Sequence, residues 1–252
     1  MWAHREVLLA LARTDFKVRY KRASFGIAWA VVLPLIQALV LAFVFSRVIG
    51  KGRGSEAFGA YVLIGVVAWS YFGLTLGAAA TSIVDGSGLT DKVWFPRALL
   101  PLSSAVANLI GLAISVGLAI ILTPVLGGHL GIDLLLLIPG ALLLVAFTAS
   151  LSLVLAALHV YFRDVRFIVQ AALLVWFYVT PIMYPATFLK DIRFLIDINP
   201  MTGIVEIFHA ATVGANPGAG RAIVSSVVVT VVLVLIAMQT YRRYDRLFVD
   251  QL

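Results

Sequence analysis

The stretch DFKVRYKRASFGIAWAVVLP, from Asp15 to Pro34, passes from strongly basic to entirely apolar within a few residues. Its first eight positions hold four Lys or Arg residues, and the twelve positions that follow hold no charge. Such a change is typical of the boundary between water and a bilayer, because cationic side chains stay near anionic lipid headgroups while apolar side chains enter the hydrocarbon. The stretch therefore predicts that the chain enters a membrane here.

The composition of the whole chain supports the same interpretation. Of its 252 residues, 62% are hydrophobic and only 12% are charged, whereas about 25% are charged in a typical soluble domain. A soluble domain of this length cannot bury so much apolar surface. The net charge of +7 fits Lys and Arg on the cytoplasmic side of a membrane better than nucleic-acid binding, since no basic segment is interleaved with stacking aromatic residues.

Six uncharged runs are each long enough for a transmembrane helix, which needs about 20 residues. They are too long and too uniformly apolar for the strands of a β-barrel, which have about ten residues of alternating polarity. We therefore predict an all-α membrane protein with one transmembrane domain over 1–252 and an interfacial segment at 1–22. The six transmembrane helices are expected near 25–48, 58–82, 99–126, 134–158, 167–188 and 222–241.

Two further features set the expected topology. Thirteen of the 19 Lys and Arg residues would lie on the side of both termini, so the positive-inside rule places both termini in the cytoplasm. Between spans five and six, the stretch from Ile198 to Gly214 is too short and too polar to cross the bilayer, because it contains Glu206 and His209. It predicts re-entrant or interfacial helices on the outer side.

Several kinds of chemistry are missing from the sequence. No predicted span has Lys, Arg, Asp or Glu in its interior, where ion-coupled transporters usually place such groups. The glycine-rich segment Gly50–Gly54 lacks the Gly-Lys-Ser/Thr ending of a phosphate-binding loop. There is no cysteine, and the four histidines are too far apart in sequence for a metal site. We expect no catalytic residue and no metal in this chain, although a passive channel and a structural membrane protein stay open.

The N-terminal segment predicts an interfacial helix. Arg13, Lys17 and Lys21 recur at four-residue spacing and share one helix face, while Leu8 and Phe16 share another with Ala12. Such a helix lies along the inner leaflet with its cations near lipid headgroups. The alternative is that these charges set the topology without forming a defined helix. The basic residues expected here are Arg13, Lys17, Arg19, Lys21 and Arg22.

Two other groups of residues are candidates for function. The segment from Asp85 to Arg97, DGSGLTDKVWFPR, is a polar interruption that could dock a partner protein, and the alternative is an ordinary loop. Aromatic residues within the spans could line a path on which sugar rings stack, and the alternative is helix packing with an aromatic belt. The candidates for the path are Trp29, Trp69, Tyr71, Phe72, Trp176 and Tyr178.

Four motifs in order resemble type-2 ABC transporter permeases that export bacterial polysaccharides such as O-antigen, capsule and teichoic acid. They begin with DFKVRYKRASFGIAWAVVLPL and cover residues 13 to 215 approximately. The later motifs are LTDKVWFPRALLPL, HVYFRDVRF, and PIMYP followed by INPMTGIVEIFHAATVG. Two positions depart from the family pattern, since Ala23 stands where many members have Ser and His209 where many have Arg.

The resemblance implies a homodimer of this chain in a bacterial cytoplasmic (inner) membrane, paired with two copies of a separate ATP-binding subunit that would hold ATP and Mg. A lipid-linked glycan would cross between the two permease copies. By analogy, the residues that contact the ATPase would be Asp91, Lys92, Trp94, Phe95 and Arg97, and those of an outer gate would be Tyr184, Asn199, Pro200 and Glu206. The alternatives are an ABC permease for a drug or small lipid, and a polytopic membrane glycosyl- or phosphotransferase.

Overall fold

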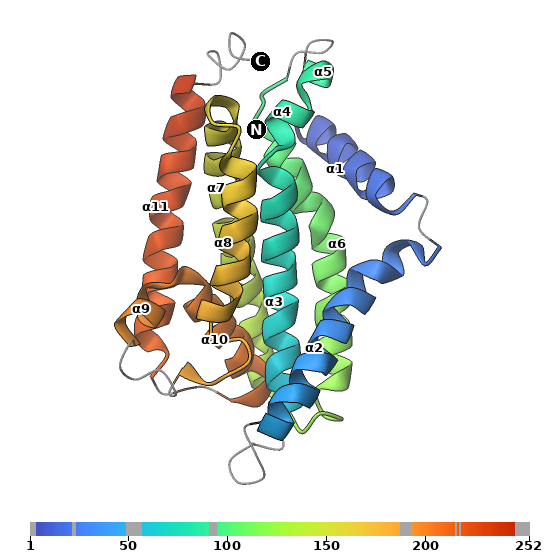
Figure 1. Ribbon diagram of the computed structural model, residues 1–252, viewed down its shortest axis with the longest axis vertical. Coiled ribbons are helices and arrows are strands. Elements are labelled where there is room, and N and C mark those ends of the chain that lie inside the picture. Colours follow the sequence, from blue (N-terminus) through green and yellow to red (C-terminus); the bar gives the residue numbers. More distant parts are fainter. Residues whose placement is uncertain are drawn as a thin grey trace.

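The computed structural model describes residues 4–21, 24–48, 57–90, 95–186, 193–214, 216 and 218–244 (Figure 1). Over these residues the fold is all helical and has no strand, as the apolar runs predict. The long helices are α2 (Trp29–Val48), α3 (Phe58–Ala79), α6 (Leu99–Leu122), α7 (Leu137–Tyr161), α8 (Val165–Val179) and α11 (Gly220–Tyr244). The remaining elements are α1 (Arg5–Tyr20), η2 (Gly26–Ala28), α4 (Ser82–Asp85), α5 (Ser87–Thr90), η3 (Ile132–Leu136), α9 (Arg193–Ile198) and α10 (Pro200–Val213).

Helix α3 forms the centre of the bundle. It packs against α2, α6, α7 and α10, and Figure 1 shows it upright between α6 and α8. In the most apolar stretch of α3, 72% of the residues are buried, against 22% in that of α11. Both stretches are apolar enough to lie in lipid. Helix α3 therefore carries the core, and the helices around it expose their outer faces.

Four helical segments are long and apolar enough to cross a membrane: α3, α6, η3 with α7, and α11. Within α2 and α8, the apolar helical segments Val32–Val44 and Val165–Val179 are shorter. The end of α11 and the turn between α7 and α8 lie at the upper end of the molecule in Figure 1, as do α4 and α5. Helices α9 and α10 lie at the lower end.

Helix α8 ends earlier than the predicted span of 167–188. It stops at Val179 because Pro181 follows Thr180, and the ring of a proline disfavours helical geometry in the residue before it. Thr180 is accordingly extended, with φ −81° and ψ 133°. The chain then forms a turn whose side chains Ile182 and Met183 are buried.

Two other predicted spans also end differently. Helix α6 stops at Leu122 rather than near residue 126, and the hydroxyl of Thr123 donates to the Ala119 carbonyl at its end. The chain reverses at Gly127, whose φ of +79° suits glycine. Helix α3 stops at Ala79 rather than near residue 82, and the short helices α4 and α5 follow it.

The polar stretch between the last two predicted spans forms α9 and α10. Asn199 caps α10 by accepting a hydrogen bond from the Met201 N–H at 3.0 Å, and Pro200 occupies the first helical turn. Asparagine favours a helix start because its side-chain oxygen accepts from a backbone N–H that has no partner within the helix. Proline favours the first turn because the N–H that it lacks would have no such partner either. Helix α10 is buried along most of its length between α3, α7 and α11, so this polar-looking stretch is part of the core.

Candidate functional site

Helix α1 has the two faces that the four-residue spacing predicts. Arg13, Lys17 and Lys21 are exposed, whereas Ala12 is buried and Phe16 is half-buried. The apolar side packs along α6. Arg22, the last of the predicted basic residues, lies outside the described residues.

Arg19 differs from the other basic residues of α1. Its guanidinium turns toward α6, where Nη1 donates to Asn108 Oδ1 at 2.6 Å. Nη2 lies 3.6 Å from the Asp15 carboxylate, one helical turn earlier. Arg19 therefore contacts protein, whereas Arg13, Lys17 and Lys21 remain available to lipid headgroups.

The predicted ATPase contacts fall partly outside the described residues. Asp91, Lys92 and Trp94 are not described, whereas Phe95 and Arg97 are both buried. Phe95 packs with Leu99 and Leu100 of α6, and partly buried leucines of α1 lie against this group. Phe95 thus joins α1 to the start of α6 inside this chain, and its predicted part in docking remains a prediction.

The predicted aromatic path divides into buried and accessible residues. Trp69 and Phe72 are buried, and the Phe72 ring centroid lies 5.2 Å from those of both Trp69 and Trp176. Tyr71 is also buried, and its hydroxyl donates to the Ala105 carbonyl at 3.2 Å. For these residues the geometry fits the packing alternative. Tyr178 is 59% exposed, and Trp29 is half-buried beside Phe25.

At the lower end, Tyr184 and Asn199 of the predicted outer gate lie at the turn after α8, whereas Pro200 lies in the first turn of α10 and its carbonyl accepts from Ser226 Oγ at 2.6 Å. The Tyr61 hydroxyl of α3 lies 3.1 Å from the carbonyl oxygens of both Pro181 and Tyr184 and donates to this pair. The Tyr184 hydroxyl donates back to the Tyr178 carbonyl at 2.7 Å. These bonds hold the turn against α3 and α8.

Asn199 ties the same turn to α10. Besides capping α10, its Oδ1 accepts a hydrogen bond from Trp176 Nε1 at 2.7 Å, and its Nδ2 donates to Thr180 Oγ1 at 3.0 Å. One buried side chain thus satisfies polar groups from α8, the turn and α10. Such a fully bonded group fixes the relative positions of the elements it joins.

His209 of α10 stacks on Tyr61, with ring centroids 3.6 Å apart and an interplanar angle of 18°. Its Nε2 lies 3.1 Å from the Tyr61 carbonyl oxygen. A carbonyl can only accept, so Nε2 carries the proton and donates. Burial lowers the pKa of His209 to about 3. His209 is therefore neutral, and it does not supply the positive charge that an arginine would carry at this position.

Glu206, one turn before His209, is buried and is 4% exposed. Asn216 Nδ2 donates to its Oε1 at 3.4 Å. Burial raises the pKa of the Glu206 carboxyl, and the Asn216 hydrogen bond and the charge of Arg193 partly oppose the shift. The carboxyl therefore holds its proton more tightly than an ordinary Glu.

Tyr61, His209 and Asn108 make contacts that sequence reasoning did not assign. Tyr61 lies in a uniformly apolar run, where one more aromatic residue carries no signal. His209 makes the stretch from Ile198 to Gly214 too polar to span and departs from the family pattern, but neither observation assigns it a contact. Asn108 is a polar residue within an apolar run, and since an amide inside a span needs a partner, its position was a usable signal.

Known proteins resemble this chain over the region that contains the residues described above. Residues 6–213 match the family described as ABC-2 type transporter. The chain is 29% identical over 213 residues to the O-antigen export system permease protein RfbA of Myxococcus xanthus, covering 83% of this chain and 81% of that protein. It is 25% identical over 207 residues to the protein of the same name from Klebsiella pneumoniae, covering 79% and 77%. These similarities confirm the resemblance that the four motifs indicate.

Proposed function

Because the chain belongs to the ABC-2 type transporter family, we propose that it is the membrane subunit of an ATP-driven exporter of a lipid-linked polysaccharide, an O-antigen or a teichoic-acid-like glycan. The observation that carries this proposal is the match over residues 6–213, together with relatives named as O-antigen export permeases that align over 81% and 77% of their own length. Similarity over about four fifths of both chains supports a shared role in transport.

The proposed arrangement has six transmembrane helices in the bacterial cytoplasmic membrane, with both termini in the cytoplasm. Helices α2 and α8 would supply the two spans beyond the four longest apolar segments. The upper end in Figure 1 would face the cytoplasm, because α1, the turn between α7 and α8 and the end of α11 lie there. The positive-inside rule supports this orientation, since Arg163, Arg166 and Arg242 belong to this end.

Two copies of the chain would form the channel. Helix α8 exposes an apolar face, with Leu174, Val175 and Tyr178 each about 60% exposed (65%, 62% and 59%). Such a face can contact lipid or a second copy. We assign it to the second copy, so that Tyr178 borders the glycan path while Trp69 and Phe72 support it from within each chain.

ATP and Mg would bind to a separate subunit at the upper end. The segment from Asp85 to Arg97 would contact that subunit through Asp91, Lys92 and Trp94. Buried Phe95 and Arg97 would then transmit the displacement to α6, because they precede that helix directly. This division of labour gives the membrane chain no catalytic residue of its own.

Co-expression with the ATP-binding subunit tests this assembly. We expect the two proteins to co-purify, with ATP hydrolysis only in the complex, and a Tyr178→Cys variant to form a disulfide-linked dimer of this otherwise cysteine-free chain. Tyr161→Cys, 45% exposed at the end of α7, is the matched control and should not cross-link. ATP hydrolysis or glycosyl transfer by the purified chain alone would contradict the proposal.

A further inference from the structure

Helix α1 is attached to the bundle in two chemically different ways along its length. Its first half is held by apolar contacts, since Leu8 and Leu11 lie against Phe95, Leu99 and Leu100. Its second half adds side-chain hydrogen bonds to α6 beside the half-buried ring of Phe16. Apolar contacts are non-directional and allow sliding, whereas charge-assisted hydrogen bonds fix position and orientation.

The hydrogen bonds of the second half form one continuous network. Arg19 Nη1 donates to Asn108 Oδ1 at 2.6 Å, and Asn108 Nδ2 donates to Thr75 Oγ1 at 3.0 Å. In parallel, Ser104 Oγ donates to Asp15 Oδ2 at 3.0 Å. The network therefore starts on α1, crosses α6 and ends on α3, where Thr75 is completely buried.

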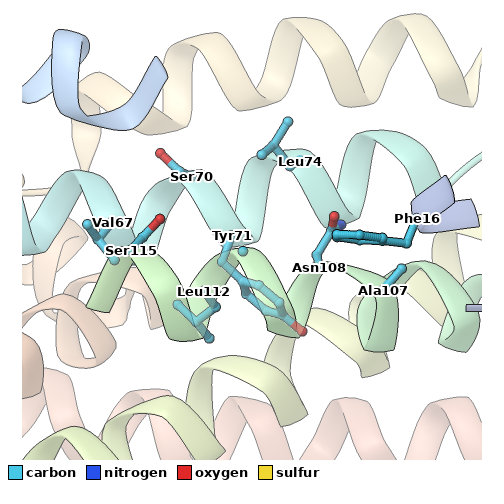
Figure 2. Close-up of a pocket in the computed structure, with 10 residues that line it drawn as sticks. Phe16, Val67, Ser70, Tyr71, Leu74, Ala107, Asn108, Leu112 and Ser115 are labelled. Atoms are coloured by element: carbon cyan, nitrogen blue, oxygen red, sulfur yellow. The ribbon is translucent and has the colours of Figure 1, made fainter. Parts of the chain in front are cut away.

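The surroundings favour a specific role for these bonds. Phe16 lies between Asp15 and Arg19 in sequence, and Figure 2 shows it beside Asn108 at the edge of a small cavity between α1, α3 and α6. This cavity has a volume of about 20 Å³, which is room for about one water molecule. A guanidinium next to apolar helices is costly unless its donors are bonded, and Asp15 and Asn108 provide acceptors on both sides.

We propose that Asp15, Arg19, Ser104, Asn108 and Thr75 form a latch, the α1 latch, that fixes α1 to α6 and α3 so that the three helices move as one body. Arg19 and Asp15 are positioning residues, and they do not bind lipid. The exposed cations Arg13, Lys17 and Lys21 contact the headgroups instead. Under the proposed function, the α1 latch would make α1 a rigid lever for the motion that the ATP-binding subunit starts.

Spin-label distances test the α1 latch without any transport assay. Labels at Val18→Cys on α1 and Ile121→Cys on α6 are suitable, because these side chains are 70% and 69% exposed and the parent has no cysteine. In vesicles of phosphatidylcholine with phosphatidylglycerol, we expect one narrow distance distribution. Arg19→Ala and Asn108→Ala should each widen it about twofold, since each removes the bond that carries the network from α1 through Asn108 and leaves only the Ser104–Asp15 bond between the second half of α1 and α6.

Arg13→Ala is the matched control, because it removes the same charge from the exposed face of the same helix. It should leave the distribution unchanged, and so should vesicles of phosphatidylcholine alone. If Arg19→Ala keeps the parent width, or if Arg13→Ala or neutral lipid widens the distribution equally, lipid headgroups hold α1 and the proposal is wrong. If Arg19→Ala does not fold, Arg19→Lys is measured instead. One ammonium cannot bridge Asp15 and Asn108 as a guanidinium does. A distance distribution as narrow as that of the parent would therefore overturn the proposal.

A second measurement rests on the proposed function. In the complex with its ATP-binding subunit, latch variants should keep ATP hydrolysis but move about three- to tenfold less glycan for each ATP. If a latch variant moves as much glycan for each ATP as the parent but has a wider distance distribution, the α1 latch fixes α1 without making it a lever. Absence of transport by the parent would contradict the proposed function and leave the distance result intact.

Discussion

Gly65 sets how closely α10 can approach α3 at the lower end of the molecule. A Cβ atom at this position would lie 3.1 Å from His209 Nε2 and 3.2 Å from Ile182 Cγ2. The absent side chain lets the imidazole reach the Tyr61 carbonyl at 3.1 Å while it stacks on the Tyr61 ring. The same glycine lets the turn after α8 pack against α3. A single residue without a side chain thus permits both contacts.

Gly65→Ala should therefore destabilise the protein. The added methyl group crowds His209 and Ile182, which costs about 1–3 kcal/mol. The measurement is the thermal unfolding midpoint in detergent. Gly77→Ala is the control, because no atom lies within 4 Å of a Cβ at Gly77, and it should stabilise α3 by about 0.5–1 kcal/mol through helix propensity. Equal effects of the two substitutions would show that His209 does not depend on the space at Gly65.

Glu206 should make stability depend on pH. Its pKa in the folded protein is raised above the ordinary value of 4.5, so the folded state binds the proton more tightly than the unfolded state. Stability is then greatest below pH 4.5 and falls as the pH rises through the raised pKa. Glu206→Gln cannot ionise and should gain stability over the parent only above that range.

Unfolding midpoints of Glu206→Gln and the parent at about pH 4 and about pH 8 check this expectation. Glu6→Gln is the control, because Glu6 is exposed on α1. An advantage of Glu206→Gln that is the same at both pH values would mean that folding does not raise the pKa of Glu206.

Local chemistry marks several helix ends, although the predicted ends of α3, α6 and α8 lie three to nine residues beyond the observed ones. The ends follow local chemistry, as at Pro181 after α8 and at Asn199 before α10, and such signals can be read from the chain. Burial does not follow local chemistry in α3, because this helix is apolar on every side. Trp69 and Phe72 are core residues since α7 and α8 cover them, and only the tertiary arrangement shows this.

Helix α1 shows the same limit for charged residues. The four-residue spacing correctly separates Arg13 and Lys17 from the apolar face. Arg19 carries the same charge on the same helix, yet it binds Asn108, 89 positions further along the chain. A contact between residues so far apart in the chain cannot be predicted from their spacing. The polar Asn108 within an apolar run was the available sign that a partner would be needed.

The turn after α8 depends on Tyr61, and this dependence can be measured. Tyr61→Phe keeps the ring that stacks on His209 but removes the hydroxyl that donates to the Pro181 and Tyr184 carbonyls. We expect hydrogen exchange of the amides over residues 180–186 to become faster, because local opening is less costly. Tyr178→Phe removes an exposed hydroxyl and serves as the control. Unchanged exchange in Tyr61→Phe would mean that packing of Ile182 and Met183 alone holds the turn.

The two ends of the bundle differ in construction. The upper end joins α1, α3 and α6 through the α1 latch. The lower end joins α3, α8 and α10 through Tyr61, Asn199 and His209. Helix α3 belongs to both groups and is the most buried of the four longest apolar segments. In the proposed exporter, a displacement that begins at the upper end would therefore reach the lower end through α3.

The most direct test is ATP-dependent movement of a glycan by the purified complex. The chain and its ATP-binding subunit are reconstituted in vesicles that hold a lipid-linked glycan, and the glycan that reaches the opposite face is measured with and without ATP. We predict translocation that needs ATP, both subunits and the lipid-linked glycan together. Translocation at the same rate without ATP, or ATP hydrolysis by the complete complex with no glycan moved, would contradict the account.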